Sequence, residues 1–178
     1  MFSLNVPLPP PVERLAGDLQ PKLSGYDRVR DRHTLVCKRF GVSAVTAADD
    51  PPPRPAALDR IRDRLRPLLA PVDPFAVAVT GVGAFETPAS GSDPVVYLAV
   101  ESDALLRLHR RLCVEYGAIE GIEGEAYVPH VTLARGGSPA AASRLVDAGV
   151  EFDPIRWRVH ALDLYDPKFR EVAATIEL

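Results

Sequence analysis

The hydrophobic and polar positions of this chain follow two periods, one typical of helices and one typical of strands. Apolar residues recur at three- to four-residue spacing in three segments, which predicts amphipathic helices over residues 12–23, 58–68 and 105–112. A fourth helix is predicted to begin at Ser138-Pro139, because serine caps a helix start and proline suits the first helical position. Ser102 is the expected cap of the third helix.

Shorter apolar runs, bounded by glycine, proline and serine, predict strands. They cover residues 1–6, 33–40, 75–83, 95–100, 127–135, 156–165 and 171–178. The Pro- and Asp-rich stretch 47–55 predicts a loop. Several strands follow one another with no helix between them, which predicts hairpins. We therefore expect an α+β fold with mainly antiparallel sheets rather than a doubly wound parallel sheet.

The predicted elements fall into two similar halves. Each half has a long amphipathic helix followed by a strand with one histidine, His33 in the first half and His130 in the second. The chain has 178 residues, of which 47% are apolar, and this is enough for one domain of two lobes with its own core. We expect that single bilobal domain to span residues 1–178.

Composition and charge narrow the classes of function. The chain has no run of 18 apolar residues and no secretory signal pattern, so we expect a cytoplasmic protein that does not act at a membrane. The net charge of −3 argues against a long electrostatic footprint on a duplex, but it allows a small cleft for one or two phosphates. Cys37 and Cys113 are expected to be reduced and buried. The sequence has no CxxC motif and no pair of histidines at helical spacing, so it does not predict a metal site.

The most informative segment is Tyr127–Arg135, which reads YVPHVTLAR. On a strand, His130 and Thr132 point to one face, while the apolar residues between and after them point to the other. An imidazole moves protons near neutral pH, and a threonine hydroxyl can donate to a phosphate oxygen. The pair therefore suits half of a phosphate-handling site. Spacing alone leaves an ordinary surface His and Thr on a half-exposed strand as the alternative.

The segment Pro129–Arg135 resembles the second signature of the 2′,5′-RNA-ligase-like branch of the two-histidine phosphoesterases. The opening strand Phe2–Pro7 and the stretch Val77–Phe85 also resemble strands of that family. The resemblance implies two α+β lobes related by a pseudo-twofold axis, with antiparallel sheets that line a central cleft. Each lobe would contribute one His-x-Thr or His-x-Ser strand to that cleft.

The first signature departs from the family pattern, because His33 and Thr34 are adjacent in Arg32-His33-Thr34. Three alternatives follow. His33 is the catalytic residue with Leu35 in the hydroxyl position; or Thr34 keeps its place while Arg32 stands where the histidine should be; or a β-bulge at His33–Thr34 turns both side chains to one side. The count from His33 to Gly41 is one residue longer than usual, which favours an extra residue in the strand.

Other polar residues have weaker claims. Arg135 corresponds to a basic position of the family and is a candidate phosphate ligand, although simple alternation would turn it away from His130. Lys38 and Arg39 line the rim of the cleft or are solvated. Tyr127 stacks on a base or, as we favour, is a half-buried strand residue. We expect His109 to be solvated, because it lies opposite the apolar stripe of its helix, and His160 to be structural.

The resemblance implies an enzyme that hydrolyses an RNA 2′,3′-cyclic phosphate to a 2′-phosphate without a metal or cofactor, and in some members a reversible 2′,5′ ligation. His33 would be the acid and His130 the base, with Thr34, Thr132 and Arg135 holding the phosphate. RNA ends or nucleotide cyclic phosphates would be the ligands of a monomer. One alternative is a module that keeps the cleft but only binds such ends; another is a cyclic phosphodiesterase for a small metabolite.

Overall fold

The computed structural model describes residues 1–41, 52–89, 91–148 and 150–178, and in this part of the chain nine strands form one antiparallel sheet. The strands are β1 Phe2–Val6, β2 Arg28–Val29, β3 Leu35–Phe40, β4 Phe75–Phe85, β5 Val95–Glu101, β6 His130–Arg135, β7 Ile155–Val159, β8 Ala161–Asp166 and β9 Glu171–Glu177. The helices are α1 Pro10–Leu19, α2 Arg54–Leu69, α3 Asp103–Tyr116 and α4 Pro139–Asp147, with 3₁₀ turns η1 Gln20–Leu23 and η3 Gly124–Ala126. No helix in these ranges is long and apolar enough to span a membrane.

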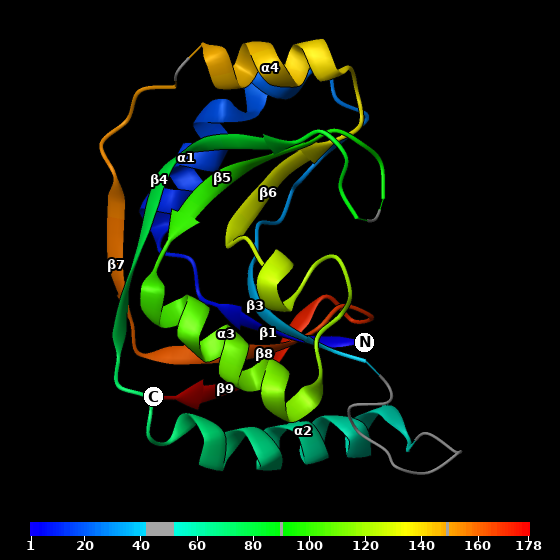
Figure 1. Ribbon diagram of the computed structural model, residues 1–178, viewed down its shortest axis with the longest axis vertical. Helices are drawn as coiled ribbons and strands as arrows, with labels where there is room; N and C mark the ends of the chain where they lie inside the picture. Colours follow the sequence, from blue (N-terminus) through cyan, green and yellow to red (C-terminus); the bar gives the residue numbers. More distant parts are fainter. Residues whose placement is uncertain (42–51, 90, 149) are drawn as a thin grey trace.

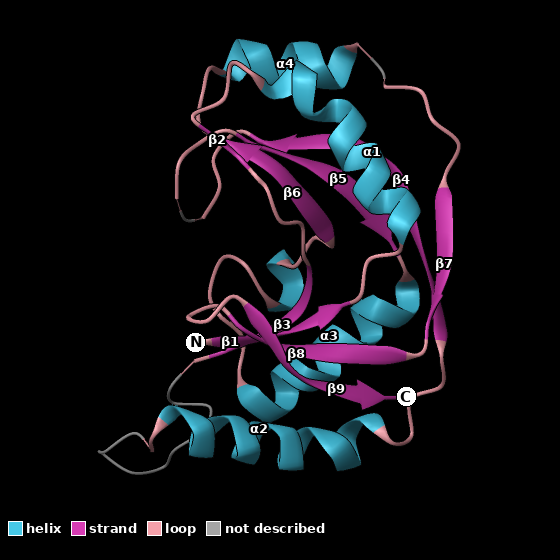
Figure 2. Ribbon diagram, turned by 180° about the vertical axis from the view of Figure 1, so that it is seen from behind, coloured by secondary structure: helices cyan, strands magenta, loops and turns pink. Residues whose placement is uncertain are grey.

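The strand order is β7-β4-β5-β6-β3-β1-β8-β9, with β2 beside β6. It divides into two four-stranded halves, which join where Leu35 of β3 pairs with Val131 of β6. The sheet curls, and α1 and α4 lie against the β4–β6 half while α2 and α3 lie against the other half (Figure 1). Figure 2 shows the same division from behind. The predicted α+β fold with antiparallel sheet is confirmed.

The helix starts form where the sequence predicts them. Ser102 Oγ accepts the backbone N–H of Leu105 at 3.2 Å, and Ser138 Oγ accepts that of Ala141 at 3.1 Å. The predicted helix over residues 12–23 is shorter than expected, because α1 ends at Leu19 and continues as η1. Pro21 has no N–H to donate to the helical carbonyl four residues earlier, so the α-helix cannot continue through it.

The predicted strand 156–165 is two strands rather than one. β7 pairs with β4 and β8 pairs with β1, so the chain passes from one half of the sheet to the other at His160. Part of the predicted loop over residues 47–55 lies outside the described residues, and α2 begins at Arg54. Both cysteines are free; Cys37 is buried as expected, whereas Cys113 is only half-buried.

Two β-bulges set the faces of the central strands. In β3 the register with β1 passes from Lys38 to Val36, so Cys37 is an extra residue. In β6 the register with β5 passes from Ala134 to Thr132, so Leu133 is an extra residue. A bulge leaves one residue unpaired and shifts the alternation of the residues beyond it. The predicted extra residue of the first segment therefore exists, but it lies within β3 and not at His33–Thr34, which precede the strand.

Candidate functional site

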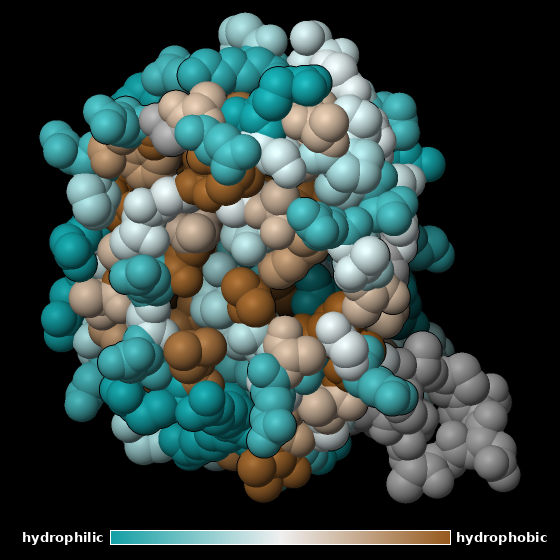
Figure 3. All heavy atoms as spheres, turned by 45° about the horizontal axis from the view of Figure 1, so that its top comes forward, coloured by the Kyte–Doolittle hydropathy of each residue, from teal (hydrophilic) through white to brown (hydrophobic). Residues whose placement is uncertain are grey.

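A cleft of about 690 Å³ lies between the two halves of the sheet. His130, Thr132 and Arg135 line it from β6, and Val36 and Arg39 line it from β3. Further lining side chains come from loops, the ends of β4 and β8, and the residues before β3; those used below are Arg30, Asp31, Arg32, Thr34, Phe85, Tyr127, Tyr165, Pro167 and Arg170. Figure 3 shows a hollow near the middle of one face of the molecule, with hydrophilic and hydrophobic residues side by side at its edge.

The imidazole of His130 is oriented by its surroundings. Its Nδ1 donates to the carbonyl of Val128 at 2.7 Å, which leaves the lone pair of the neutral ring on Nε2. The rings of Phe85 and Tyr97 meet the imidazole edge to face, with centroids 5.1 and 5.3 Å away. Burial lowers the pKa of His130. The hydrogen bond to the Val128 carbonyl raises the pKa, and the positive charges of Arg39 and Arg135 lower it further. The residue is therefore a neutral base at pH 7.

The aromatic support of His130 depends on Gly83 in β4. A Cβ at this position would lie 2.7 Å from the ring of Tyr97. Because glycine has none, Tyr97 can lie flat beside the strand and stack on Phe85 with ring centroids 4.3 Å apart. The glycine thus allows the two rings to pack against the imidazole.

His33 lies outside this cleft. Its Nδ1 is 3.0 Å from Oε2 of Glu13 in α1, and it lines a separate cavity of about 200 Å³ with that carboxylate. Arg32 and Thr34, one residue to either side, line the cleft instead. The structure therefore does not bring His33 and His130 together. It agrees with the second alternative, in which Thr34 keeps its place and Arg32 stands in the histidine position.

Two contacts hold Arg32 at the cleft. Its guanidinium donates to the carbonyl of Arg170 and lies over the ring of Tyr165, with 5.0 Å from Cζ to the centroid. Both partners belong to the end of β8 and the turn that follows it, in the half of the sheet that does not contain His130. Because β3 and β6 are antiparallel and Leu35 pairs with Val131, the register places Thr34 opposite Thr132.

Arg135 lines the cleft because of the bulge in β6. Simple alternation from His130 would turn Arg135 away, but the extra Leu133 restores it to the face of Thr132. The bulge in β3 does the same for Arg39 after Val36. Burial lowers the pKa of the Arg135 guanidinium, and the nearby charges of Arg30 and Arg39 lower it further. These three guanidinium groups form a positive field that an anion would neutralise.

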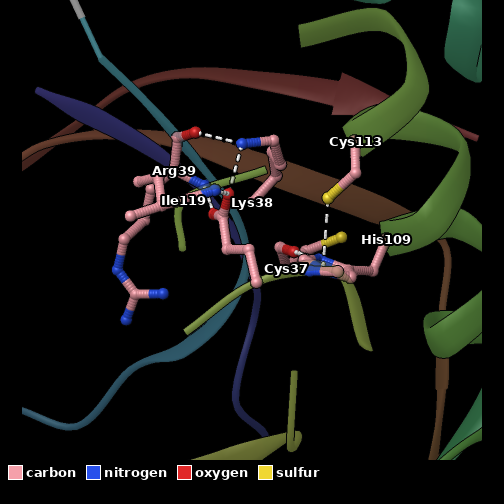
Figure 4. Close-up of polar contacts among 8 residues, drawn as sticks. Cys37, Lys38, Arg39, His109, Cys113 and Ile119 are labelled. Atoms are coloured by element: carbon pink, nitrogen blue, oxygen red, sulfur yellow. Dashed lines mark hydrogen bonds and ion pairs between the residues drawn. The ribbon is translucent and has the colours of Figure 1, made fainter. Parts of the chain in front are cut away.

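A buried network fixes one wall of the cleft to β3 (Figure 4). Glu123, 4% exposed, accepts hydrogen bonds from Lys38 Nζ at 2.6 Å and from the backbone N–H groups of Arg39 and Ile119 at 2.7 and 3.0 Å. The prediction that Lys38 lines the rim of the cleft or is solvated is wrong, because this residue is 1% exposed. The bulge at Cys37 is the reason, because it turns Lys38 inward toward Glu123.

His109 belongs to the same network, and its predicted solvation is also wrong. The side chain is 1% exposed, donates from Nδ1 to the carbonyl of Cys37 at 2.7 Å, and accepts the N–H of Gly124 at Nε2 at 2.9 Å. Its ring stacks on Tyr127, with centroids 3.8 Å apart, and the Tyr127 hydroxyl donates to the Val36 carbonyl at 2.7 Å. The loop after α3 covers the polar side of this helix, which periodicity within the helix cannot reveal.

The remaining histidine, His160, is exposed at the junction of β7 and β8, where its carbonyl accepts the N–H of Leu178. It does not line the cleft. Across the described ranges, no group of three or more His, Cys, Asp or Glu side chains is placed to hold a metal ion.

With this fold and site established, comparison with known proteins identifies the class. The chain matches the 2′-5′ RNA ligase superfamily over residues 44–168, and it belongs to that family of two-histidine phosphoesterases. Its structure is similar to the crystal structure of TT0787 of Thermus thermophilus, with a TM-score of 0.62 and 22% identity over 99% of this chain and 97% of that one. No curated protein matches the sequence. The family match includes His130 and Thr132 but begins after Arg32-His33-Thr34.

We predict that Glu123→Ala lowers the free energy of unfolding by about 3–5 kcal/mol, because it leaves the Lys38 ammonium buried without its charge partner. Urea denaturation of the two proteins measures this difference. Glu120→Ala, at an exposed position of the same loop, is the matched control and should change stability by no more than about 0.5 kcal/mol. Equal effects of the two substitutions would show that the network does not anchor the loop.

Proposed function

We propose that the cleft binds the 2′,3′-cyclic phosphate of a nucleotide or RNA end and opens it slowly to a 2′-phosphate, without a metal, using His130 as its one imidazole. The observation that carries this proposal is the composition of the cleft. Among the described lining residues, His130 is the one histidine, and it is accompanied by five arginines and three threonines, of which Thr34 and Thr132 are opposite each other in register. Membership of the 2′-5′ RNA ligase superfamily supports the choice of phosphodiester.

In this proposal His130 is the general base. Its Nε2 carries the lone pair because Nδ1 is bonded to Val128, and its low pKa keeps it unprotonated near neutrality. Nε2 takes a proton from water as the water oxygen attacks phosphorus. The bond from phosphorus to the 3′ oxygen then breaks, and the products are a 2′-phosphate and a free 3′ hydroxyl.

Thr34, Thr132 and Arg135 are proposed to hold the phosphate oxygens. Thr34 and Thr132 flank the pair Leu35–Val131 at the β3–β6 junction. Both threonines line the cleft together with Arg135, which supports this role. Negative charge grows on the non-bridging oxygens as phosphorus becomes pentacoordinate. Fixed donors and cations in a partly buried cleft stabilise that charge.

The first half-site supplies a guanidinium rather than an imidazole. Arg32, held by Tyr165 and Arg170, can stabilise the charge on the departing 3′ oxygen. A guanidinium group is a poor proton donor near neutral pH, because it stays charged there. The oxygen is therefore protonated by solvent water. A positioned acid typically contributes about 10²–10⁴-fold, so we expect tight binding and slow turnover.

A second candidate is a module that binds such phosphate ends without any turnover. The same observation favours it, since the residue at the first half-site is an arginine. A nucleoside 2′-phosphate titrated by calorimetry, beside a cyclic-phosphate assay, separates the two functions. Binding with no ring opening in the wild type would favour the module.

We predict that His130→Ala abolishes opening of a 2′,3′-cyclic phosphate, whereas His33→Gln leaves it within about twofold of wild type. The amide of the introduced glutamine can still donate to Glu13, so the fold should be kept. Product formation is followed by chromatography in buffer that contains EDTA. Complete inhibition of the wild type by EDTA, or loss of activity in His33→Gln alone, would contradict the assignment.

The pH profile of kcat/KM should fall on the acidic side only. His130 must be neutral to accept a proton, and its pKa lies below the usual 6.5, so the rate should fall only below that pH. No second imidazole has to stay protonated, so we expect a plateau up to about pH 9 instead of a bell. A rate profile over pH 4–9 measures this. A bell with a descending limb near neutrality would indicate a second titrating group.

Arg32→His should restore a second imidazole to the first half-site. We predict that kcat rises by at least about 10-fold, as part of the gain expected from a positioned acid, and that a descending alkaline limb appears. Arg32→Gln, which restores no acid, should not gain activity. If Arg32→His is slower than wild type, the absence of an acid does not limit the reaction.

A further inference from the structure

We propose that the turn between β8 and β9, residues 167–170, is a second nucleotide subsite, in which Phe169 stacks on the base next to the terminal nucleotide of a single strand. This inference rests on the proposed function, because it extends the ligand whose phosphate lies in the cleft. Phe169 is 61% exposed. Pro167 and Arg170, two residues before it and one after it, both line the cleft.

The turn borders the cleft, because Pro167 and Arg170 at its two ends both line it. In both ribbon views it lies on the same side of the molecule as the loop between β4 and β5 (Figures 1 and 2). A strand that extends from the cleft over this turn would pass Phe169, because Phe169 lies between the two lining residues Pro167 and Arg170 in the chain. In a strand bound by its 3′-terminal cyclic phosphate, the next base lies one backbone unit away on the 5′ side, and this is the base that the turn would contact.

Contacts on both sides of Phe169 hold the turn in place. Before it, Asp166 Oδ2 accepts from Arg54 Nε at 2.7 Å, and Asp166 Oδ1 accepts the backbone N–H of Lys168 at 2.8 Å. After it, the Arg170 guanidinium is 3.2 Å from Asp31, and the Arg170 carbonyl accepts from Arg32. An exposed aromatic ring on a fixed turn can bind without first losing much conformational freedom.

Arg170 has a φ of 56°, in the left-handed region that a non-glycine residue rarely adopts. The residue keeps this strained conformation because both its carbonyl and its guanidinium are bound to the Asp31–Arg32 segment. Strain of this kind persists where surrounding contacts fix it, often at ligand-binding positions. Here it fixes Arg170, the residue after Phe169, against the segment that contains Arg32.

The ammonium group of Lys168 beside Phe169 and the arginines of the cleft favour a polyanion as the occupant, whereas the charge of Arg170 is already paired with Asp31. Lys168 precedes the ring, with Nζ 5.4 Å from its centroid, and Arg170 follows it. Arg30, Arg39 and Arg135 continue the positive charge into the cleft, although the whole chain carries −3. Aromatic rings between cations are typical of single-strand binding, where bases stack on the rings and phosphates meet the cations.

The test compares two ligands on three proteins. The ligands are cytidine 2′,3′-cyclic phosphate and a trinucleotide that ends in the same group; the proteins are wild type, Phe169→Ala and Val172→Ala. We expect Phe169→Ala to weaken binding of the trinucleotide by about 5–150-fold, the range found for a base stacked on an aromatic ring, and to leave the mononucleotide unchanged. Val172, 44% exposed on β9, is the control for loss of exposed apolar surface.

Two further arms make the result specific. Phe169→Trp should restore trinucleotide binding, and a trinucleotide with an abasic penultimate position should bind wild type no better than it binds Phe169→Ala. Equal binding of the trinucleotide by wild type and Phe169→Ala, or an equal loss for both ligands, overturns the subsite. Failure of wild type to bind either ligand overturns the proposed function too. Phe169-dependent binding with no ring opening overturns only the proposed turnover.

Discussion

The pairing of β3 with β6 at Leu35 and Val131 is the contact on which the cleft depends. It joins the two halves of the sheet and sets Thr34 opposite Thr132, although these segments lie almost a hundred residues apart in the chain. A one-residue slip would turn every side chain of one strand to the other face. A bulge on each side, at Cys37 and at Leu133, then returns Arg39 and Arg135 to the cleft. Strand register thus determines which residues can meet one phosphate.

The buried network around Glu123 connects this junction to His130. Glu123 and His109 bind backbone groups of β3 at its bulge, and Tyr127 donates to the carbonyl of Val36. The next residue, Val128, accepts from Nδ1 of His130. The bulge in β3 and the tautomer of His130 are therefore linked by consecutive contacts through one loop. Buried polar groups that are fully bonded hold a structure in one arrangement, because any loss leaves a group unsatisfied.

The two sides of the cleft present different side chains. Arg32 takes the cleft position, and the adjacent imidazole of His33 is bound to Glu13 in a separate cavity. A guanidinium attracts and holds phosphate as well as an imidazole does, but it releases a proton poorly. In the proposed reaction, this arrangement favours electrostatic stabilisation of the phosphate over proton transfer to the leaving group. Under the proposed function, the cleft would bind a phosphate end more effectively than it would hydrolyse it.

The sequence by itself determined the elements, the α+β class, the caps at Ser102 and Ser138, and the common face of His130 and Thr132. These follow from local rules: the periods of helix and strand, and the hydrogen bonds of a helix start. Tertiary structure decided the rest. Partners distant in the chain determine the break at His160, the positions of the bulges and the burial of Lys38 and His109. They also determine that Arg32, and not His33, lines the cleft. Glu13 holds His33, and Arg170 holds Arg32, and neither contact leaves a trace in the spacing of Arg32-His33-Thr34.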